Sequence, residues 1–271
     1  MKPREEATNR APLVIIGGGN MGAALAQGLI QSGHLQDTLS ICETSAQRRA
    51  ELTKMFPKLS VVADVPSCRE AVIAVKPPDA CSAAKSAVAA GAERIVSIAA
   101  GVRIGALREA CGDSVRIIRA MPNTPATVGR ATTAISPSAE CSVADRQWAN
   151  DLLSSVGAVF EIPEAMMDAF TGLVGSGPAY LFYVAEALRD AAVAEGFDPQ
   201  TSSKLVANLL SGSAALLELQ PDDAAELRAR VTSPNGTTAA GVAALESHRV
   251  REAVIAAVRA ATRRSKELGD A

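Results

Sequence analysis

A run of three glycines begins a motif that could bind a dinucleotide. Gly17, Gly19 and Gly22 fit the pattern G-x-G-x-x-G, directly after the apolar run 13–16 and at the start of the helical stretch 23–31. The first glycine allows a tight turn, the second lets the backbone approach a pyrophosphate, and the third lets helix and strand pack closely. The helix N-terminus adds partial positive charge. The spacing therefore predicts a dinucleotide site.

An acidic residue, Glu43, follows the second apolar run, about 20 positions after the glycines. A carboxylate there accepts a hydrogen bond from the ribose 2′-OH of NAD and repels the 2′-phosphate of NADP. Thr44, Ser45, Arg48 and Arg49 come next, and hydroxyls with a guanidinium suit a 2′-phosphate. The two arginines also fit a solvated helix start, so the sequence leaves the choice between NAD and NADP open.

Three further segments each follow a strand-like run, at residues 74–77, 97–101 and 119–123. Any one of them alone is an ordinary connection between a strand and a helix. In a doubly wound sheet, however, the ligand lies over the carboxyl ends of the strands. We therefore expect these loops to surround the nicotinamide.

The elements that must position these residues alternate in type. Short β-branched runs at 13–16, 39–42, 71–75, 95–99 and 115–118 are separated by Ala-rich helical stretches. Repeated βα units of this kind predict an α/β, Rossmann-type doubly wound domain with a parallel sheet covered on both faces.

The pattern changes near Pro163, beyond which helix-start signals replace strand-like runs. They are Pro163, Ser176-Gly177-Pro178, Asp198-Pro199 and Asn235-Gly236. We predict an NAD(P)-binding domain over residues 1–163 and an all-α substrate and dimerisation domain over 164–271. The Ala-rich helices carry few large side chains, which favours burial against a partner subunit over a self-contained bundle.

Composition excludes several other classes of protein. The chain has 271 residues, 27 Lys and Arg against 29 Asp and Glu, and few aromatics (5 Phe, 2 Tyr, 1 Trp), so we expect no nucleic-acid partner. Five scattered cysteines and two histidines predict no metal site. The apolar stretch 11–30 contains Asn20 and Gln27 and fits a strand, turn and helix better than a membrane span. The charged residues 1–10 give no export signal, which predicts a cytoplasmic protein.

Two motifs in the second half make a resemblance specific. They are G-S-G-P-A-Y at 175–180 and V-T-S-P-N-G-T-T at 231–238. Together with the strand-end loops they make the chain, from about Leu13 to Leu268, resemble the pyrroline-5-carboxylate reductase family. The resemblance implies reduction of L-1-pyrroline-5-carboxylate to L-proline by NADPH or NADH, the last step of proline biosynthesis, with NADPH favoured by the family. It also implies a helical domain that interlocks in a homodimer, with dimers often forming decamers.

The resemblance and the glycine pattern together assign the site residues. The cofactor-binding residues are Gly17, Gly19, Asn20, Met21, Gly22, Glu43, Lys76, Pro77 and Asn123. The substrate-binding residues are Ser233, Asn235, Gly236, Thr237 and Thr238. Asn235 stands where the family most often has a second glycine, and Asn tolerates a left-handed backbone better than most residues.

The substrate loop implies a division of labour. Because residues 233–237 precede a helix, their backbone N–H groups would bind the substrate carboxylate. The Thr238 hydroxyl would hydrogen-bond the imine nitrogen while hydride passes to the imine carbon, which makes Thr238 the candidate catalytic residue. A hydroxyl that merely caps the helix is the alternative role.

Two other functions are open to a Rossmann domain joined to a helical domain. Dehydrogenases of the 3-hydroxyacid and 6-phosphogluconate type place a catalytic lysine one turn into the helix after a glycine-rich start. Here that helix reads G-S-G-P-A-Y-L, without a lysine, which weighs against alcohol oxidation. A non-catalytic dinucleotide-sensing protein is the second alternative, and turnover with pyrroline-5-carboxylate would separate it from an enzyme.

Overall fold

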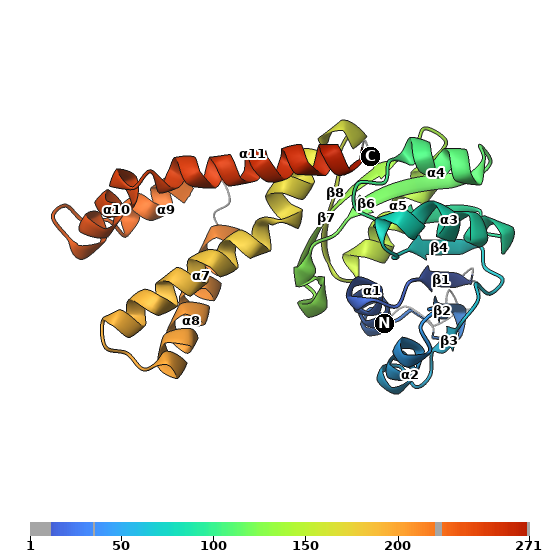
Figure 1. Cartoon of the computed structure of the whole chain (residues 1–271), viewed down its shortest axis with the longest axis horizontal. Coiled ribbons are helices and arrows are strands. Elements are labelled where there is room, and N and C mark those ends of the chain that lie inside the picture. The colour runs from blue at the N-terminus through green and yellow to red at the C-terminus, as the bar shows by residue number, and fades with distance from the viewer. Residues whose placement is uncertain (1–11, 35, 220–223, 270–271) are drawn as a thin grey trace, which may run out of the picture. The chain divides into compact units, whose positions relative to one another are not determined.

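The computed structural model describes residues 12–34, 36–219 and 224–269 (Figure 1). The charged segment 1–10, used above to predict the absence of an export signal, lies outside them. The strands are β1 (Leu13–Ile16), β2 (Leu39–Cys42), β3 (Ser60–Val62), β4 (Glu70–Ile73), β5 (Arg94–Ser97), β6 (Arg116–Met121), β7 (Ala131–Pro137) and β8 (Gly157–Glu161). The α-helices of the first half are α1 (Asn20–Gln31), α2 (Ala46–Met55), α3 (Ala80–Ala89), α4 (Ile104–Cys111) and α5 (Val143–Ser154). Those of the second half are α6 (Met167–Phe170), α7 (Gly177–Ala194), α8 (Pro199–Leu219), α9 (Ala224–Arg230), α10 (Thr237–Ser247) and α11 (Val250–Gly269).

The strands form one sheet in the order β3-β2-β1-β4-β5-β6-β7-β8. All neighbours are parallel except β6 and β7. The predicted doubly wound sheet is therefore confirmed. The sequence patterns did not indicate β3, β7 or β8, and they did not indicate the antiparallel step. The order reverses between β1 and β4, which places a ligand crevice at the carboxyl ends of these strands.

Helices cover both faces of the sheet, as Figure 1 shows. On one face, side chains of α1, α2 and α5 pack with Ile15, Val72 and Ile118 of the strands. On the other face, α3 and α4 pack with Val14 and Ile73. Because successive strand residues point to opposite faces, strands buried on both sides must be apolar throughout, as β1 is.

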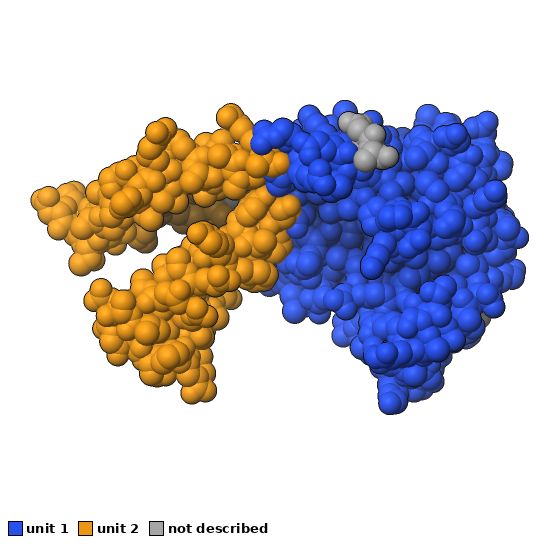
Figure 2. Space-filling view, in the orientation of Figure 1, with its two compact units in different colours: residues 1–175, 261–271 blue, residues 176–260 orange. Residues whose placement is uncertain are grey.

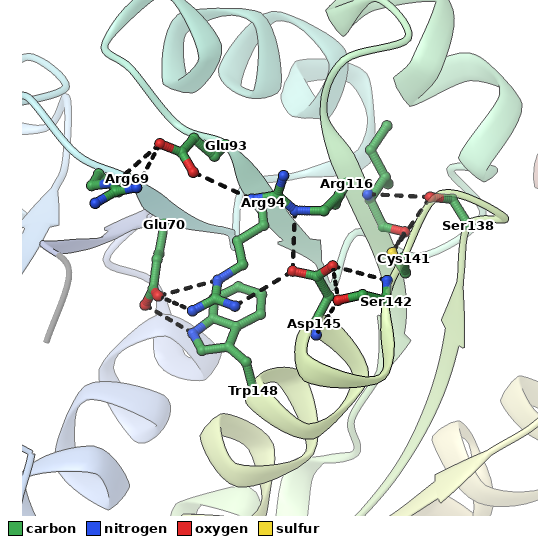
Figure 3. A network of polar contacts seen from close by, with 11 residues as sticks. Arg69, Glu70, Glu93, Arg94, Arg116, Ser138, Cys141, Ser142, Asp145 and Trp148 are labelled. Carbon is green, nitrogen blue, oxygen red and sulfur yellow. Dashed lines mark hydrogen bonds and ion pairs between the residues drawn. The ribbon is translucent and has the colours of Figure 1, made fainter.

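A polar network holds the opposite, amino ends of β4, β5 and β6 (Figure 3). Glu70 accepts from Arg94 and, at 2.8 Å, from the Trp148 indole N–H. Arg94 also lies over the Trp148 ring, 4.5 Å from its centroid. Asp145, in the first turn of α5, accepts from Arg116 Nε at 3.1 Å. These contacts tie three strands to α5 at the end of the sheet away from the predicted crevice.

The chain divides into two compact units (Figure 2). Unit 1 comprises residues 1–175 and 261–271, and unit 2 comprises residues 176–260. The sequence instead predicts a division between 163 and 164. The difference arises because residues 164–175 pack within unit 1: the Glu164 carboxylate accepts from the Ile104 N–H at 2.8 Å and from Arg119 at 3.1 Å, and Met167 is fully buried.

The end of α11 also belongs to unit 1. Ser265 Oγ donates to Asp168 Oδ1 at 2.7 Å. A Cβ on Gly269 would lie 2.9 Å from the Gly101 carbonyl oxygen, so the two backbones nearly touch. Unit 1 is therefore built from both ends of the described chain.

Unit 2 is entirely helical, as predicted, and has almost no interior of its own. Among its described residues, Ser202 and Val206 alone are buried. Large apolar side chains of α7 and α8 are exposed in the single chain, among them Leu181, Phe182, Tyr183, Leu205, Leu209 and Leu216. A surface of this kind is characteristic of an interaction site.

Candidate functional site

The glycine loop runs from the end of β1 to the start of α1, and its geometry explains two of its glycines. Gly17 has a φ of 106°, in the left-handed region, and a Cβ there would lie 2.5 Å from the Ala74 carbonyl oxygen. A Cβ on Gly22 would lie 2.0 Å from the Gly17 carbonyl oxygen. Side chains at these positions would therefore displace the loop or push α1 away from the sheet.

Gly19 plays a different part. It is the N-cap residue of α1, no side chain caps this helix, and a Cβ on Gly19 would meet nothing within 4 Å. The first turn of α1, Asn20 to Gly22, thus presents backbone N–H groups beside open space. An uncapped helix N-terminus next to a residue without a side chain fits a pyrophosphate.

The second residue of the glycine run, Gly18, is held by side chains of the next βα unit. Its N–H donates to Glu43 Oε2 at 3.0 Å, and its carbonyl accepts from Arg48 Nε at 2.7 Å. A Cβ on Gly18 would lie 2.3 Å from Leu52 Cδ1. We call this arrangement of Glu43, Arg48 and Gly18 the loop clamp. The G-x-G-x-x-G pattern leaves position 18 unspecified, so sequence reasoning missed the close packing around Gly18. The signal was the unbroken run of three glycines.

The Cys42 thiol at the carboxyl end of β2 is buried beside both acidic and basic side chains. Burial, followed by the nearby carboxylates Asp64 and Glu43, raises the pKa of the Cys42 thiol. The thiol therefore stays neutral at neutral pH, where it donates to the Ala63 carbonyl at 3.4 Å. Arg49 lies close by and donates to the backbone carbonyls of Glu43 and Thr44, at 2.9 and 2.7 Å.

The loops after β4 and β6 differ in how their predicted site residues are held. Lys76 is exposed and precedes a 3-10 turn that begins at Pro77. Asn123 is buried, and its amide is engaged within unit 1: Oδ1 accepts from the Thr132 N–H at 2.9 Å, and Nδ2 donates to the Val174 carbonyl at 3.2 Å. Val174 belongs to a π-helix over Thr171–Gly175. The Asn123 side chain thus links β6 and β7 to this π-helix, which no sequence pattern indicated.

The predicted substrate loop lies in unit 2, immediately before α10. Gly236 N–H donates to the Ser233 carbonyl at 3.1 Å, which closes a turn, and Asn235 has a φ of 62°. Gly236 is the N-cap of α10 and no side chain caps the helix. Thr237 and Thr238 are exposed in its first turn. The loop therefore combines a left-handed Asn with a helix N-terminus whose backbone N–H groups have no side-chain cap.

Two negative findings concern the described part of the chain. None of its helices has the length and apolar content needed to cross a membrane. Its His, Cys, Asp and Glu side chains form no group of three or more placed to hold a metal ion.

A doubly wound sheet, a glycine cradle at its switch point and an acidic residue after the second strand define a dinucleotide-dependent oxidoreductase. Residues 12–101 match the family described as "NADP oxidoreductase coenzyme F420-dependent". Residues 164–268 match the family described as "Pyrroline-5-carboxylate reductase dimerisation".

Relatives over nearly the whole length narrow the class to one family. The pyrroline-5-carboxylate reductase of Synechocystis sp. is 39% identical over 265 residues, covering 95% of this chain and 98% of the relative. A solved pyrroline-5-carboxylate reductase from Coxiella burnetii has a TM-score of 0.88 at 30% identity, covering 96% of this chain and 99% of its own. The chain belongs to the pyrroline-5-carboxylate reductase family.

A further solved relative bears on the cofactor. The pyrroline carboxylate reductase of Plasmodium falciparum, solved with NADP bound, has a TM-score of 0.85 at 30% identity and covers 96% of this chain and 98% of its own. This chain is an oxidoreductase whose cofactor is NADP or NAD, as the glycine cradle and the family indicate. The match of residues 164–268 to a dimerisation family assigns self-association to that part of the chain.

Proposed function

We propose that this chain reduces L-1-pyrroline-5-carboxylate to L-proline with NADPH or NADH. The observation that carries the proposal is the turn before α10, where Asn235 adopts a φ of 62° and no side chain caps the helix. A family whose substrate bears one carboxylate and one cyclic imine needs such an anion site, and the turn provides it without a cationic side chain.

The cofactor residues divide by the part of the dinucleotide that each would hold. Backbone N–H groups at Gly19, Asn20, Met21 and Gly22 would bind the pyrophosphate, with Gly17 shaping the turn. Glu43 would hold the adenosine ribose. Lys76, Pro77 and Asn123 would border the nicotinamide, with Asn123 acting through its backbone because its side-chain amide is already hydrogen-bonded. When bound, the reduced nicotinamide supplies the hydride that reaches the imine carbon.

The substrate residues act through the backbone and one hydroxyl. N–H groups from Ser233 to Thr237, including those of Asn235 and Gly236, would bind the carboxylate and fix the orientation of the ring. Thr238 Oγ would hydrogen-bond the imine nitrogen, which must be protonated to accept hydride at the neighbouring carbon. A threonine hydroxyl is too weak an acid to deliver that proton alone, so its role is to position the nitrogen and favour its protonated form.

Replacing the hydroxyl tests this role. Thr238→Ala should lower kcat on pyrroline-5-carboxylate by about 10²-fold, with binding of the dinucleotide unchanged. Thr238→Ser keeps the hydroxyl and should retain most of the activity. Initial rates with both cofactors measure kcat, and fluorescence titration with NADPH or NADH checks binding. Wild-type kcat in a folded Thr238→Ala protein would exclude the hydroxyl from the mechanism, whereas absence of turnover in the wild type would favour a dinucleotide sensor.

The alternative dehydrogenase chemistry lacks its catalytic lysine in α7. This helix reads G-P-A-Y-L-F-Y-V-A-E-A-L-R-D-A-A-V-A and contains no lysine. Oxidation of a hydroxyacid needs a group that takes the alcohol proton. We therefore assign imine reduction, rather than alcohol oxidation, to this chain.

The finer features of the assembly are part of the same proposal. A homodimer, with a decamer built from five such dimers as the larger form, would bury the exposed apolar side chains of α7 and α8. We place the functional division of the chain at 163/164, so that 164–271 supplies the substrate loop and the dimer surface.

The cytoplasm, where thiols stay reduced, suits a chain whose five cysteines are all free.

A further inference from the structure

The Glu43 carboxylate is fixed from two sides, by Gly18 of the loop clamp and by Ser45. Oε2 accepts from the Gly18 N–H at 3.0 Å and Oε1 accepts from the Ser45 N–H at 2.8 Å. Rotation of the Glu43 side chain would break both hydrogen bonds. Each is stronger than a bond between neutral groups because its acceptor is a carboxylate. Glu43 is therefore held as a negative charge at the carboxyl end of β2, where the fold receives the adenosine ribose.

The cations that could neutralise this charge are engaged elsewhere. Arg48 uses Nε on the Gly18 carbonyl at 2.7 Å and pairs with Glu51 Oε2 at 2.8 Å, and its side chain is 25% exposed. Arg49 donates to the carbonyls of Glu43 and Thr44. Both guanidinium groups therefore hold backbone carbonyls that shape the loop. The Ser45 hydroxyl accepts from the Arg48 N–H as the N-cap of α2.

We propose that Glu43, held by the loop clamp, makes this chain select NADH over NADPH, with Arg48 as a positioning residue for the glycine loop rather than a phosphate ligand. The inference rests on the proposed dinucleotide site. Its reason is electrostatic: a fixed carboxylate accepts from a ribose 2′-OH but repels a 2′-phosphate.

Binding of adenosine-side fragments tests the selection apart from catalysis. Isothermal titration of the wild-type oligomer with ADP-ribose and with 2′-phospho-ADP-ribose measures the ribose contact without nicotinamide or substrate. We expect ADP-ribose to bind at least about tenfold more tightly than 2′-phospho-ADP-ribose, because Glu43 repels the 2′-phosphate. We likewise expect kcat/KM to be higher with NADH than with NADPH.

Two variants separate Glu43 from Arg48. Glu43→Gln keeps one carbonyl acceptor and removes the charge, so binding of 2′-phospho-ADP-ribose should improve by about tenfold, within the range of a charge interaction near a surface. Arg48→Met removes the hydrogen bond to Gly18 and should weaken both fragments by about tenfold each, leaving their ratio unchanged. Glu109→Gln, the same chemical change at an exposed position of α4, is the matched control and should alter neither.

Several outcomes would overturn the proposal. One is tighter or equal binding of 2′-phospho-ADP-ribose by the wild type. Another is an Arg48→Met variant that loses affinity for the phosphorylated fragment alone, which would make Arg48 a phosphate ligand. Binding of neither fragment would overturn the dinucleotide site itself, and with it the proposed function, whereas a reversed preference in an enzyme that turns over pyrroline-5-carboxylate would overturn the selection only.

Discussion

Asn235 illustrates how a backbone requirement selects a residue. Its φ of 62° lies in the left-handed region, which glycine adopts freely and which strains most L residues other than Asn and Asp. The family most often has glycine there, and Asn meets the same requirement at lower conformational entropy in the unfolded chain. The sequence departure noted at this position therefore preserves the turn.

Gly236 is constrained by the turn itself, which leads to a prediction. A Cβ there would lie 2.6 Å from Ser233 Oγ and 3.1 Å from the Ser233 carbonyl oxygen. Gly236→Ala should therefore distort the carboxylate-binding turn and raise KM for pyrroline-5-carboxylate by at least about tenfold, the effect of one lost hydrogen bond to a charged group. Steady-state kinetics measure it. Gly105→Ala, in a helix where the added Cβ meets nothing within 4 Å, is the control. A Gly236→Ala enzyme with unchanged KM would show that the turn does not bind substrate.

At the level of elements, the strands that sequence patterns indicated are those buried on both faces. β3 is three residues long and β8 lies at the sheet edge with exposed side chains, so neither forms a continuous apolar run. β7 was missed because its threonines interrupt the pattern. Its direction follows from chain length: residues 122–130 are too few for a right-handed parallel crossover, which needs a dozen residues or more.

The features of the site also divide into those set by local backbone conformation and those set by tertiary contacts. The glycine loop and the Asn-Gly turn depend on local backbone conformation, so the sequence indicates both. The loop clamp depends on how Arg48 and Leu52 of α2 pack against Gly18. The hydrogen bond from Asn123 to the Val174 carbonyl joins residues 51 positions apart. Contacts of this kind arise from tertiary packing, and no residue spacing specifies them.

The start of α5 carries a pH-dependent contribution to stability. Burial alone would raise the pKa of the Asp145 carboxyl, but hydrogen bonds from the Ser142 hydroxyl and N–H, and the Arg116 and Arg94 guanidinium groups, hold it below its ordinary value. A pKa lowered by folding means that the folded state favours the carboxylate. The stabilisation is therefore complete above the unfolded value of about 3.9 and is lost as the pH falls through the folded value.

Asp145→Asn tests this contribution. The variant should unfold with a free energy lower by about 1–3 kcal/mol at pH 7, because a buried acceptor of charge-assisted hydrogen bonds is lost. The difference from the wild type should shrink below about pH 4. Urea unfolding at fixed protein concentration measures both. Asp151→Asn, on the exposed side of the same helix, should change stability by less than about 0.5 kcal/mol. An Asp145→Asn deficit that is equal at pH 3 and pH 7 would contradict the assignment.

At the scale of the whole molecule, unit 2 depends on a partner for its interior. With Ser202 and Val206 alone buried among its described residues, it cannot offset the conformational entropy of its ordered helices. We predict a stable oligomer at micromolar concentration, with a mass at least twice the 27.9 kDa of one chain. Light scattering measures the mass, and thermal unfolding should occur at a higher temperature as protein concentration rises. A folded sample at the mass of one chain would disprove this.

The return of α11 to unit 1 bears on the order in which the protein can be assembled during synthesis. The strands of the sheet, residues 13–161, leave the ribosome first, but the contacts of Ser265 with Asp168 and of Gly269 with Gly101 need residues that are translated about a hundred positions later. Asp168 and Gly101 therefore lack these contacts while the helices of unit 2 are translated. Translation of the end of α11, rather than emergence of the sheet, is therefore the event that completes unit 1.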